Sequence, residues 1–361
     1  MSEAVMADEV TIELHPDWDA ALVVIKDNTR KKFLVSSQVL TIASAYFKAL
    51  FTSGFEEGTK TQSGSRPEIS LQDDSTEAME VILSILHYKF LDEWNTLSAK
   101  SLATIAVHSD KYCCTASLSP WVDRWLANFQ HTIERRDVGY LLLATSALEE
   151  APSFQRVSRL AVLSLPLNFN FNLWHADDTL AALPEEVTEY ISRKMKQVSK
   201  RLYSLLQETV IALVQNQSDI GRMHSSRCCK CLLVYERHRA LHCPQCLPRD
   251  GEEPGAGDFP VFCCSETRVA ECTLILTKHA LYPNEKAWRM CTISEIAQRF
   301  NMVHMTRTHK CDFDQHCPLK KRLRSLEEAV ANTIDGVLGM KLGTMTADDS
   351  TTKSEAETSQ G

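Results

Sequence analysis

Cysteines at metal-binding spacing are the residues of this sequence that are best suited to chemistry. Cys228 and Cys231 form one Cys-x-x-Cys pair, and Cys243 and Cys246 form a second pair eleven residues later. Each pair can occupy two corners of a tetrahedral Zn²⁺ site, and four thiolates complete the site. Because a catalytic zinc keeps one position open for water, this set predicts a structural zinc ion.

Neighbouring residues leave the choice of ligands open. Cys229 and His242 each adjoin a predicted ligand, so the ligand set could be shifted by one position. The residues between the two pairs, LLVYERHRALH, are rich in β-forming side chains and predict a short hairpin, as in zinc ribbons. A second candidate metal site contains Cys311, His316 and Cys317, with His309, Cys263 or Cys264 as further candidate ligands.

Composition and charge narrow the class of protein. The chain has 361 residues, of which 44% are apolar and 24% are charged, as in ordinary globular proteins. Its formal charge of −8 gives no support to nucleic-acid binding, which needs a basic surface. The most apolar stretch, residues 160–174, is short and is interrupted by Pro166, so no membrane span is predicted.

The cysteines also bear on the expected compartment. The start of the chain, MSEAVMADEVTIELHPDWD, is acidic and lacks the apolar run of a signal peptide. We therefore expect a cytoplasmic or nuclear protein, where disulfides rarely persist. Metal binding then accounts for the cysteines after residue 227, whereas Cys113 and Cys114 are predicted to be small core residues of an apolar helix.

No enzyme is predicted from the sequence. It has no Gly-x-Ser-x-Gly nucleophile motif, no glycine-rich phosphate loop and no His-Glu-x-x-His zinc protease motif. Glycine makes up only 12 of the 361 residues, few for a chain that must surround phosphates.

The first third of the chain alternates between strand and helix patterns. Hydrophobic periodicity predicts strands near residues 10–14, 22–25, 33–35 and 68–71, and helices within residues 39–51, 77–88 and 98–112. The two central strands are joined by the polar turn KDNTRKK and predict a hairpin.

Capping residues set the expected helix starts in this third. Ser44 is predicted to cap a second short helix, and Asp74 with Glu77 has the spacing of a capping box. Ser119 followed by Pro120 predicts the start of a further helix, with proline in its first position.

This order of elements resembles the BTB/POZ domain, and four segments make the resemblance specific. They are FLVSSQVLTIASAYFKALFTSGFEEG (33–58), EISLQDD (68–74), EAMEVILSILHY (77–88) and AVHSDKY (106–112). The resemblance implies an α+β module that binds other proteins and performs no catalysis. It is greatest to fungal-type BTB proteins, whose C-terminal half is helical and contains cysteine and histidine.

The expected organisation follows from this resemblance and from the later helical patterns. An N-terminal tail (1–16) precedes the BTB/POZ module (17–127), and a helical region ending in a long helix (128–217) comes next. A Cys/His-rich, zinc-stitched and mostly α-helical region (218–342) and a disordered tail (343–361) complete the chain. The long helix carries an apolar seam that predicts docking on the preceding helices, with a coiled-coil dimer as the alternative.

Two positions bear on the partners that the resemblance implies. Family members that repress transcription pair an aspartate, here Asp19, with a basic residue, but Ser36 and Ser37 stand in its place. A lone buried Asp19 is costly, which argues against that type of homodimer. Cullin-binding members carry a hydrophobic-x-Glu motif, which Phe55 and Glu57 match, although Phe55 could instead close the domain's own core.

The function expected from the sequence is therefore a non-enzymatic interaction protein, with substrate adaptor of a cullin ubiquitin ligase as its specific form. The alternative is a nuclear transcription- or chromatin-associated regulator that uses the BTB module for assembly and the zinc region for binding. The basic run from Lys320 to Arg324 bears on that alternative, but apolar residues at helical spacing place the run on a solvated helix face.

Overall fold

The computed structural model describes most of the chain in nine stretches. These are residues 9–26, 29–52, 65–130, 133–215, 225–227, 234–236, 265–282, 285–306 and 318–342. The chain divides into two compact units. Unit 1 comprises Met1–Val162, Phe169–Ser192 and Leu338–Gly361, and unit 2 comprises Leu163–Asn168 and Arg193–Val337.

Unit 1 is built on a four-stranded sheet in the order β1-β3-β2-β4. Its strands are β1 (Glu9–Glu13), β2 (Ala20–Lys26), β3 (Thr29–Val35) and β4 (Glu68–Gln72). The hairpin expected from the sequence is confirmed, because β2 and β3 pair antiparallel with Leu22 opposite Phe33. The outer strands β1 and β4 each pair parallel to their neighbour. The pairing of β1 with β3 places residues 9–13 in the sheet of the module rather than in a preceding tail.

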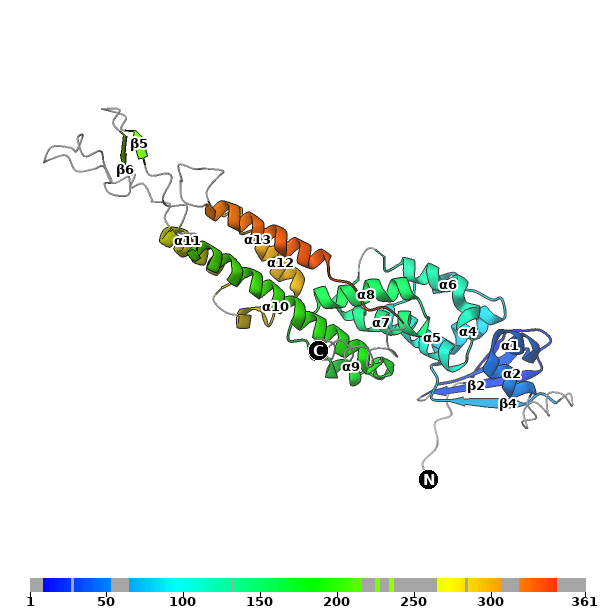
Figure 1. Cartoon of the computed structure of the whole chain (residues 1–361). Helices are drawn as coiled ribbons and strands as arrows, with labels where there is room; N and C mark the ends of the chain where they lie inside the picture. Colours follow the sequence, from blue (N-terminus) through cyan, green and yellow to red (C-terminus); the bar gives the residue numbers. More distant parts are fainter. Residues whose placement is uncertain are drawn as a thin grey trace, which may run out of the picture. The chain divides into compact units, whose positions relative to one another are not determined.

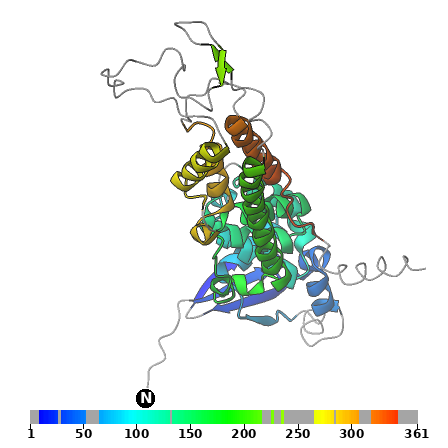
Figure 2. The same ribbon diagram turned by 60° about the vertical axis from the view of Figure 1, so that its left-hand side comes forward.

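Helices cover this sheet, and α1, α2 and α4 lie on the same side of it (Figures 1 and 2). The helices of the first 130 residues are α1 (Ser37–Ala43), α2 (Ala45–Thr52), α4 (Thr76–Leu86), the 3₁₀ turn η1 (Asp92–Asn95), α5 (Ala99–Lys111) and α6 (Thr115–Ala127). The core of this part contains the buried side chains of β2, which point to both faces of the sheet, and most of α4. Burial of their apolar side chains stabilises the fold.

The predicted helix caps are confirmed in part. The hydroxyl of Ser44 accepts the N–H of Phe47 at 3.1 Å, so Ser44 begins α2 as expected. The cap of α4 is Ser75, whose hydroxyl accepts the N–H of Ala78, and not Asp74. Asp74 does not cap the helix because its carboxylate is buried against the side chains of α5.

The region around Cys113 also differs from expectation. Helix α5 ends at Lys111, and Cys113 follows in a left-handed turn with φ of 47°. Cys113 is exposed and Cys114 is buried, so only Cys114 is a core residue, and neither lies inside a helix. Helix α6 begins at Thr115 rather than after Ser119, and it contains Pro120 in its second turn at the loss of one backbone hydrogen bond.

The rest of unit 1 is helical. It contains the 3₁₀ turn η2 (Arg135–Asp137), α7 (Val138–Ala147), α8 (Ala151–Ser164), α9 (Asn172–His175), the 3₁₀ turn η3 (Leu180–Ala182) and the start of α10 (Glu185–Gln215). A segment from much later in the sequence, residues 338–340, packs on α8. The N–H of Met340 donates to the hydroxyl of Ser158 at 2.8 Å, and Tyr190 donates to the carbonyl of Leu338.

Unit 2 contains the remainder of α10 together with later helices and a small sheet. These elements are β5 (Ser225–Arg227), β6 (Val234–Glu236), α11 (Ser265–Lys278), the 3₁₀ turn η5 (Glu285–Trp288), α12 (Ile293–Asn301) and α13 (Pro318–Asp335). Helices α10, α12 and α13 lie side by side (Figures 1 and 2). The sequence also predicts that Thr292 caps a helix running through Phe300. This cap is confirmed at the start of α12, where Thr292 and Glu295 form a complete capping box.

The long helix α10 begins after Pro184, as predicted, and its apolar seam is buried. The seam consists of Ile191, Met195, Val198, Leu202 and Leu205. In unit 2 the ring of Tyr203 on α10 meets that of Trp288 edge-on, so α10 packs there against a segment that follows it in the sequence. None of the helices that the structure describes is long and apolar enough to cross a membrane.

Candidate protein-interaction site

The residues that the sequence assigned to sites lie outside the described stretches. Phe55 and Glu57 belong to residues 53–64, between the end of α2 and the start of β4. The predicted zinc ligands Cys228, Cys231, Cys243 and Cys246, and the second set Cys311, His316 and Cys317, also lie outside the described residues. Among the residues that are described, no group of three or more Cys, His, Asp or Glu could hold a metal ion.

The small sheet of unit 2 bears on the expected zinc hairpin. Strand β6 lies within the insert between the two Cys-x-x-Cys pairs, where a strand was predicted. Its partner is β5, which precedes the first pair, and Ser226 stands opposite Tyr235. The hairpin therefore brackets the first cysteine pair in the sequence instead of lying between the two pairs.

Two buried cysteines of unit 2 are not part of any described metal cluster. Cys272 is fully buried in α11, and burial raises the pKa of its thiol to about 12. A thiol that remains protonated packs as a small apolar residue. The Sγ atom of Cys291, which lies just before the cap of α12, accepts a hydrogen bond from the Arg299 guanidinium at 3.1 Å.

Asp19 is satisfied by a neighbouring serine, which corrects the expectation of an unpaired acid. The Ser37 N–H donates to one carboxylate oxygen of Asp19 at 2.7 Å, and the Ser37 hydroxyl donates to the other at 2.6 Å. Asp19 is only half-buried. Its negative charge lies at the first residue of α1, where the helix dipole favours it. No basic partner is needed, so the cost expected of Asp19 does not arise.

Helix α2 is held on the core by aromatic rings. Phe47 stacks on Tyr112 with ring centroids 5.3 Å apart, and Tyr46 meets both rings edge-on. The Ser44 hydroxyl also donates to the carbonyl of Tyr112 at 2.6 Å. These contacts hold α2, which precedes residues 53–64 in the sequence, on the core of the domain. Ile42 of α1, with 88% of its surface exposed, and Tyr46 of α2 present apolar area to solvent.

A buried polar cluster that sequence reasoning missed joins α4 to α5. The Asp74 side chain is 1% exposed, and it accepts hydrogen bonds from the Tyr112 hydroxyl and from the Lys111 ammonium, the latter at 2.6 Å. Burial and the adjacent carboxylate raise the pKa of Tyr112 above its ordinary value, so its phenol stays a donor. The only signal for this cluster in the sequence was its presence in the segments EISLQDD and AVHSDKY.

A groove lies at the ends of β2 and β4, with a volume of about 730 Å³. Its walls are formed by Ile25, Lys26, Gln72, Asp73, Thr104, Val107, His108, Asp178, Thr179 and Ala182. Charged groups of both signs lie on its rim around a few apolar side chains. It contains no nucleophile paired with a base, so nothing in its lining supports catalysis.

Unit 1 thus combines a single sheet, in which the β2–β3 hairpin is extended by the parallel strands β1 and β4, with short helices and a polar cluster between α4 and α5. Residues 14–117 match the family model of the BTB/POZ domain. The matched range begins and ends somewhat earlier than the 17–127 expected from the sequence. No curated protein matches the chain.

The BTB domain is generally a non-enzymatic module that binds other proteins, and its mixed helix and strand content agrees with the fold of unit 1. The family match therefore indicates that residues 14–117 form a protein-binding module. The helices after residue 117 are not covered by the family match.

Proposed function

We propose that this BTB protein is a substrate adaptor of a cullin ubiquitin ligase, acting in the cytoplasm or nucleus. The observation that carries the proposal is the position of Phe55 and Glu57 in the BTB domain. They follow α2 directly, and α2 is anchored by Phe47 and Tyr112. An aromatic residue such as Phe55 is a typical anchor of a protein interface, and Ile42 of the same domain also exposes apolar area.

The test is co-precipitation of the full chain with the cullins of its own cell, detected by antibodies to each cullin. Phe55→Ala and Glu57→Ala are expected to reduce the recovered cullin strongly, because truncation of an aromatic anchor removes a binding hot spot. Leu173→Ala is the matched control, since Leu173 is an exposed apolar residue outside residues 14–117. Equal recovery of a cullin by all three variants, or recovery of none by the unaltered chain, would refute the adaptor role.

We further propose that the C-terminal half follows the fungal-type pattern and contains structural zinc, held by Cys228, Cys231, Cys243 and Cys246. The β5–β6 hairpin supports this, because the first Cys-x-x-Cys pair falls in the sequence between its two strands, and short hairpins beside such pairs are typical of zinc ribbons. The four thiolates would supply no open position, so the ion would fold the segment rather than act on a substrate.

Freshly purified, reduced protein is expected to contain at least one tightly bound zinc ion per chain. Cys243→Ser should lower the zinc content and loosen the C-terminal half, because metal binding and local folding are coupled. The BTB domain should keep its melting behaviour in this variant. Elemental analysis that finds no zinc would contradict the proposal, and zinc that persists in both Cys243→Ser and Cys231→Ser would contradict this ligand set.

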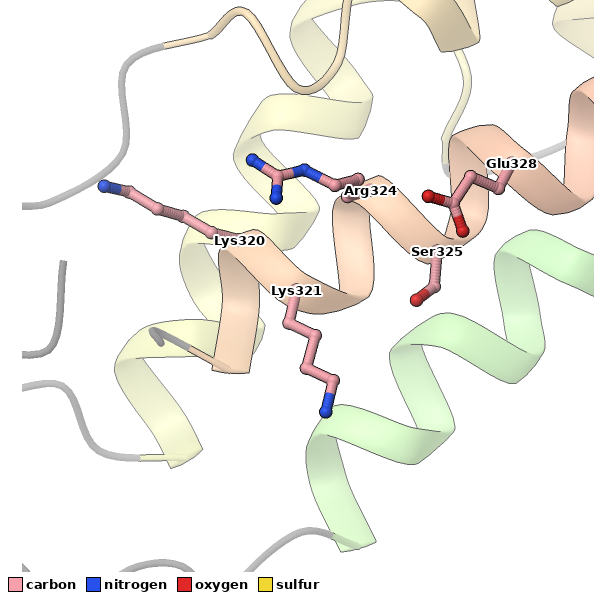
Figure 3. A pocket seen from close by; sticks show the side chains of 5 residues that line it. All are labelled: Lys320, Lys321, Arg324, Ser325 and Glu328. Carbon is pink, nitrogen blue, oxygen red and sulfur yellow. The ribbon is translucent and has the colours of Figure 1, made fainter. Parts of the chain in front are cut away.

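A basic surface on α13 favours the alternative of a chromatin-associated regulator. Lys320, Lys321, Arg324, Ser325 and Glu328 line a shallow hollow of about 300 Å³, and Lys321 points towards α10 (Figure 3). Leu319 and Leu323 are buried beneath this face, as expected for a solvated helix face. Fluorescence anisotropy of labelled duplex DNA, titrated with the full chain, tests this alternative. Salt-sensitive binding that Lys321→Glu weakens would support it, and no binding at low salt would exclude it.

A further inference from the structure

Two histidines of unit 1 hold the N-termini of helices in the same way. His87 follows α4 and His108 lies in α5, and each ring donates its Nδ1–H to the carbonyl four residues earlier at 2.8 Å. The other nitrogen, Nε2, accepts a backbone N–H, from Ser36 at 3.0 Å for His87 and from Ser75 at 2.9 Å for His108. Ser36 and Ser75 are the N-cap residues of α1 and α4. Each histidine therefore ties its own helix to the first turn of another helix.

These links exist only while the rings are neutral. Because Nε2 accepts a backbone hydrogen, the ring proton must be on Nδ1. A second proton on Nε2 removes the acceptor and leaves a buried backbone N–H without a partner, which is unfavourable. Burial lowers the pKa of both His87 and His108 below the ordinary value of 6.5, which agrees with neutral rings at neutral pH.

Among the described residues, the charged groups that act on His87 disfavour a positive charge on its ring. The charged groups that bear on it are His15, beyond β1, and Lys89, whose ammonium donates to the carbonyl of Glu13. Both lower the pKa of His87 further. The carboxylate of Asp19, which lies at the first residue of α1, already accepts both donors of Ser37. Protonation of His87 would therefore place a further cation near Lys89.

His108 has a different environment, which makes it a natural comparison. Its Nε2 lies 3.3 Å from the buried carboxylate of Asp74, which would attract a protonated ring. Lys111 and Lys26 oppose that charge from α5 and from the end of β2. Two further acids, Asp73 and Asp178, line the groove to which His108 contributes. A protonated His108 thus keeps Asp74 as a partner, whereas no acid of the described residues acts on His87 in this way.

We propose that His87 is an acid-sensitive latch between α4 and α1: protonation of its Nε2 frees the Ser36 N–H and loosens the first turn of α1. Helix α1 continues through Ser44 into α2, which leads to the segment that contains Phe55 and Glu57. Mild acid should therefore weaken partner binding by the BTB domain. That consequence rests on the proposed function, but the latch itself does not.

The pH window follows from the direction of the shift. The unfolded chain binds a proton at His87 near pH 6.5, whereas the folded chain does so only at lower pH. The contribution of the latch is fully present above pH 6.5 and is lost as the pH falls from 6.5 towards the lowered folded value. In this window the unfolded state binds more protons, so stability rises with pH.

The test is hydrogen exchange of the full chain at pH 7.5 and pH 5.5, with rates corrected for the intrinsic effect of pH. The Ser36 amide is expected to lose about tenfold or more of its protection at pH 5.5, and the Ser75 amide is expected to lose less. In His87→Gln the side-chain amide can still accept the Ser36 N–H but does not titrate, so protection should become independent of pH.

A second measurement keeps the inference open to refutation if His87→Gln does not fold. The imidazole carbons of the unaltered, ¹³C-labelled chain can be titrated by NMR, and His87 should titrate below 6.5. Unchanged corrected protection of Ser36 between the two pH values, or a His87 midpoint above 6.5, would overturn the latch. Loss of cullin binding in acid with unchanged Ser36 protection would also overturn it, while leaving the adaptor proposal intact.

Discussion

Replacing Asp74 by alanine is expected to destabilise unit 1 by about 3 kcal/mol, in the range seen when one partner of a buried polar pair is removed. The carboxylate of Asp74 is 1% exposed and is the acceptor for both Tyr112 and Lys111. Without it the buried Tyr112 hydroxyl loses its acceptor, and α5 keeps only the hydrogen bond between His108 and Ser75 as a polar link of this cluster to the start of α4. Urea unfolding of the full chain, followed by near-ultraviolet circular dichroism, measures the loss.

Two further variants separate the parts of this cluster. Tyr112→Phe removes only the hydroxyl and should cost about 1 kcal/mol, the usual value of one hydrogen bond. Lys111→Ala should cost less still, because the Lys111 side chain is 47% exposed and its ion pair is screened by water. If Lys111→Ala cost as much as Asp74→Ala, the ion pair rather than the buried hydroxyl would hold α4 to α5, contrary to this account.

Replacing Gly339 by alanine is the second substitution with a large expected effect. A Cβ atom at Gly339 would lie 1.7 Å from the carbonyl oxygen of Gln155 and 2.7 Å from the hydroxyl of Ser158. The backbone of α8 cannot move far enough to make room for this atom, so residues 338–340 must move away from α8. The loss of the Met340–Ser158 hydrogen bond and of Met340 burial should destabilise unit 1 by about 3 kcal/mol.

Gly336 provides a matched control for this substitution. A Cβ atom there would lie 3.2 Å from the carbonyl oxygen of Asn332, a contact that a small shift of the neighbouring atoms relieves. Gly336→Ala should therefore change stability by less than about 1 kcal/mol. Limited proteolysis should cut Gly339→Ala near its C-terminal segment well before Gly336→Ala. Equal resistance of the two variants would mean that residues 338–340 are not held on α8.

Local patterns in the sequence predicted the elements that depend on near neighbours. The β2–β3 hairpin, the Ser44 cap and the capping box of Thr292 with Glu295 all follow from residues only a few positions apart. Each involves one periodic pattern or one side chain bonding its own helix start. Such features do not depend on the rest of the fold, so they could be assigned without it.

The incorrect expectations came from contacts that are distant in the sequence. Asp74 has the spacing of a cap, but its carboxylate bonds to Tyr112, so Ser75 caps α4 instead. Asp19 was expected to lack a partner because no basic residue stands at positions 36 and 37, whereas Ser37 supplies it with two donors. The close approach of Gly339 to α8 joins residues far apart along the chain, and no local pattern indicates it.

The central claim is that residues 14–117 bind a cullin through the segment after α2, and a titration of purified components tests it most directly. Calorimetry of the full chain against the N-terminal domain of each cullin of its own cell should give saturable binding to one of them. Phe55→Ala should weaken that binding about thirtyfold, which corresponds to about 2 kcal/mol, with an unchanged melting temperature. Leu173→Ala should bind as the unaltered chain does. No binding to any cullin, or equal affinity of Phe55→Ala and the unaltered chain, would contradict the account.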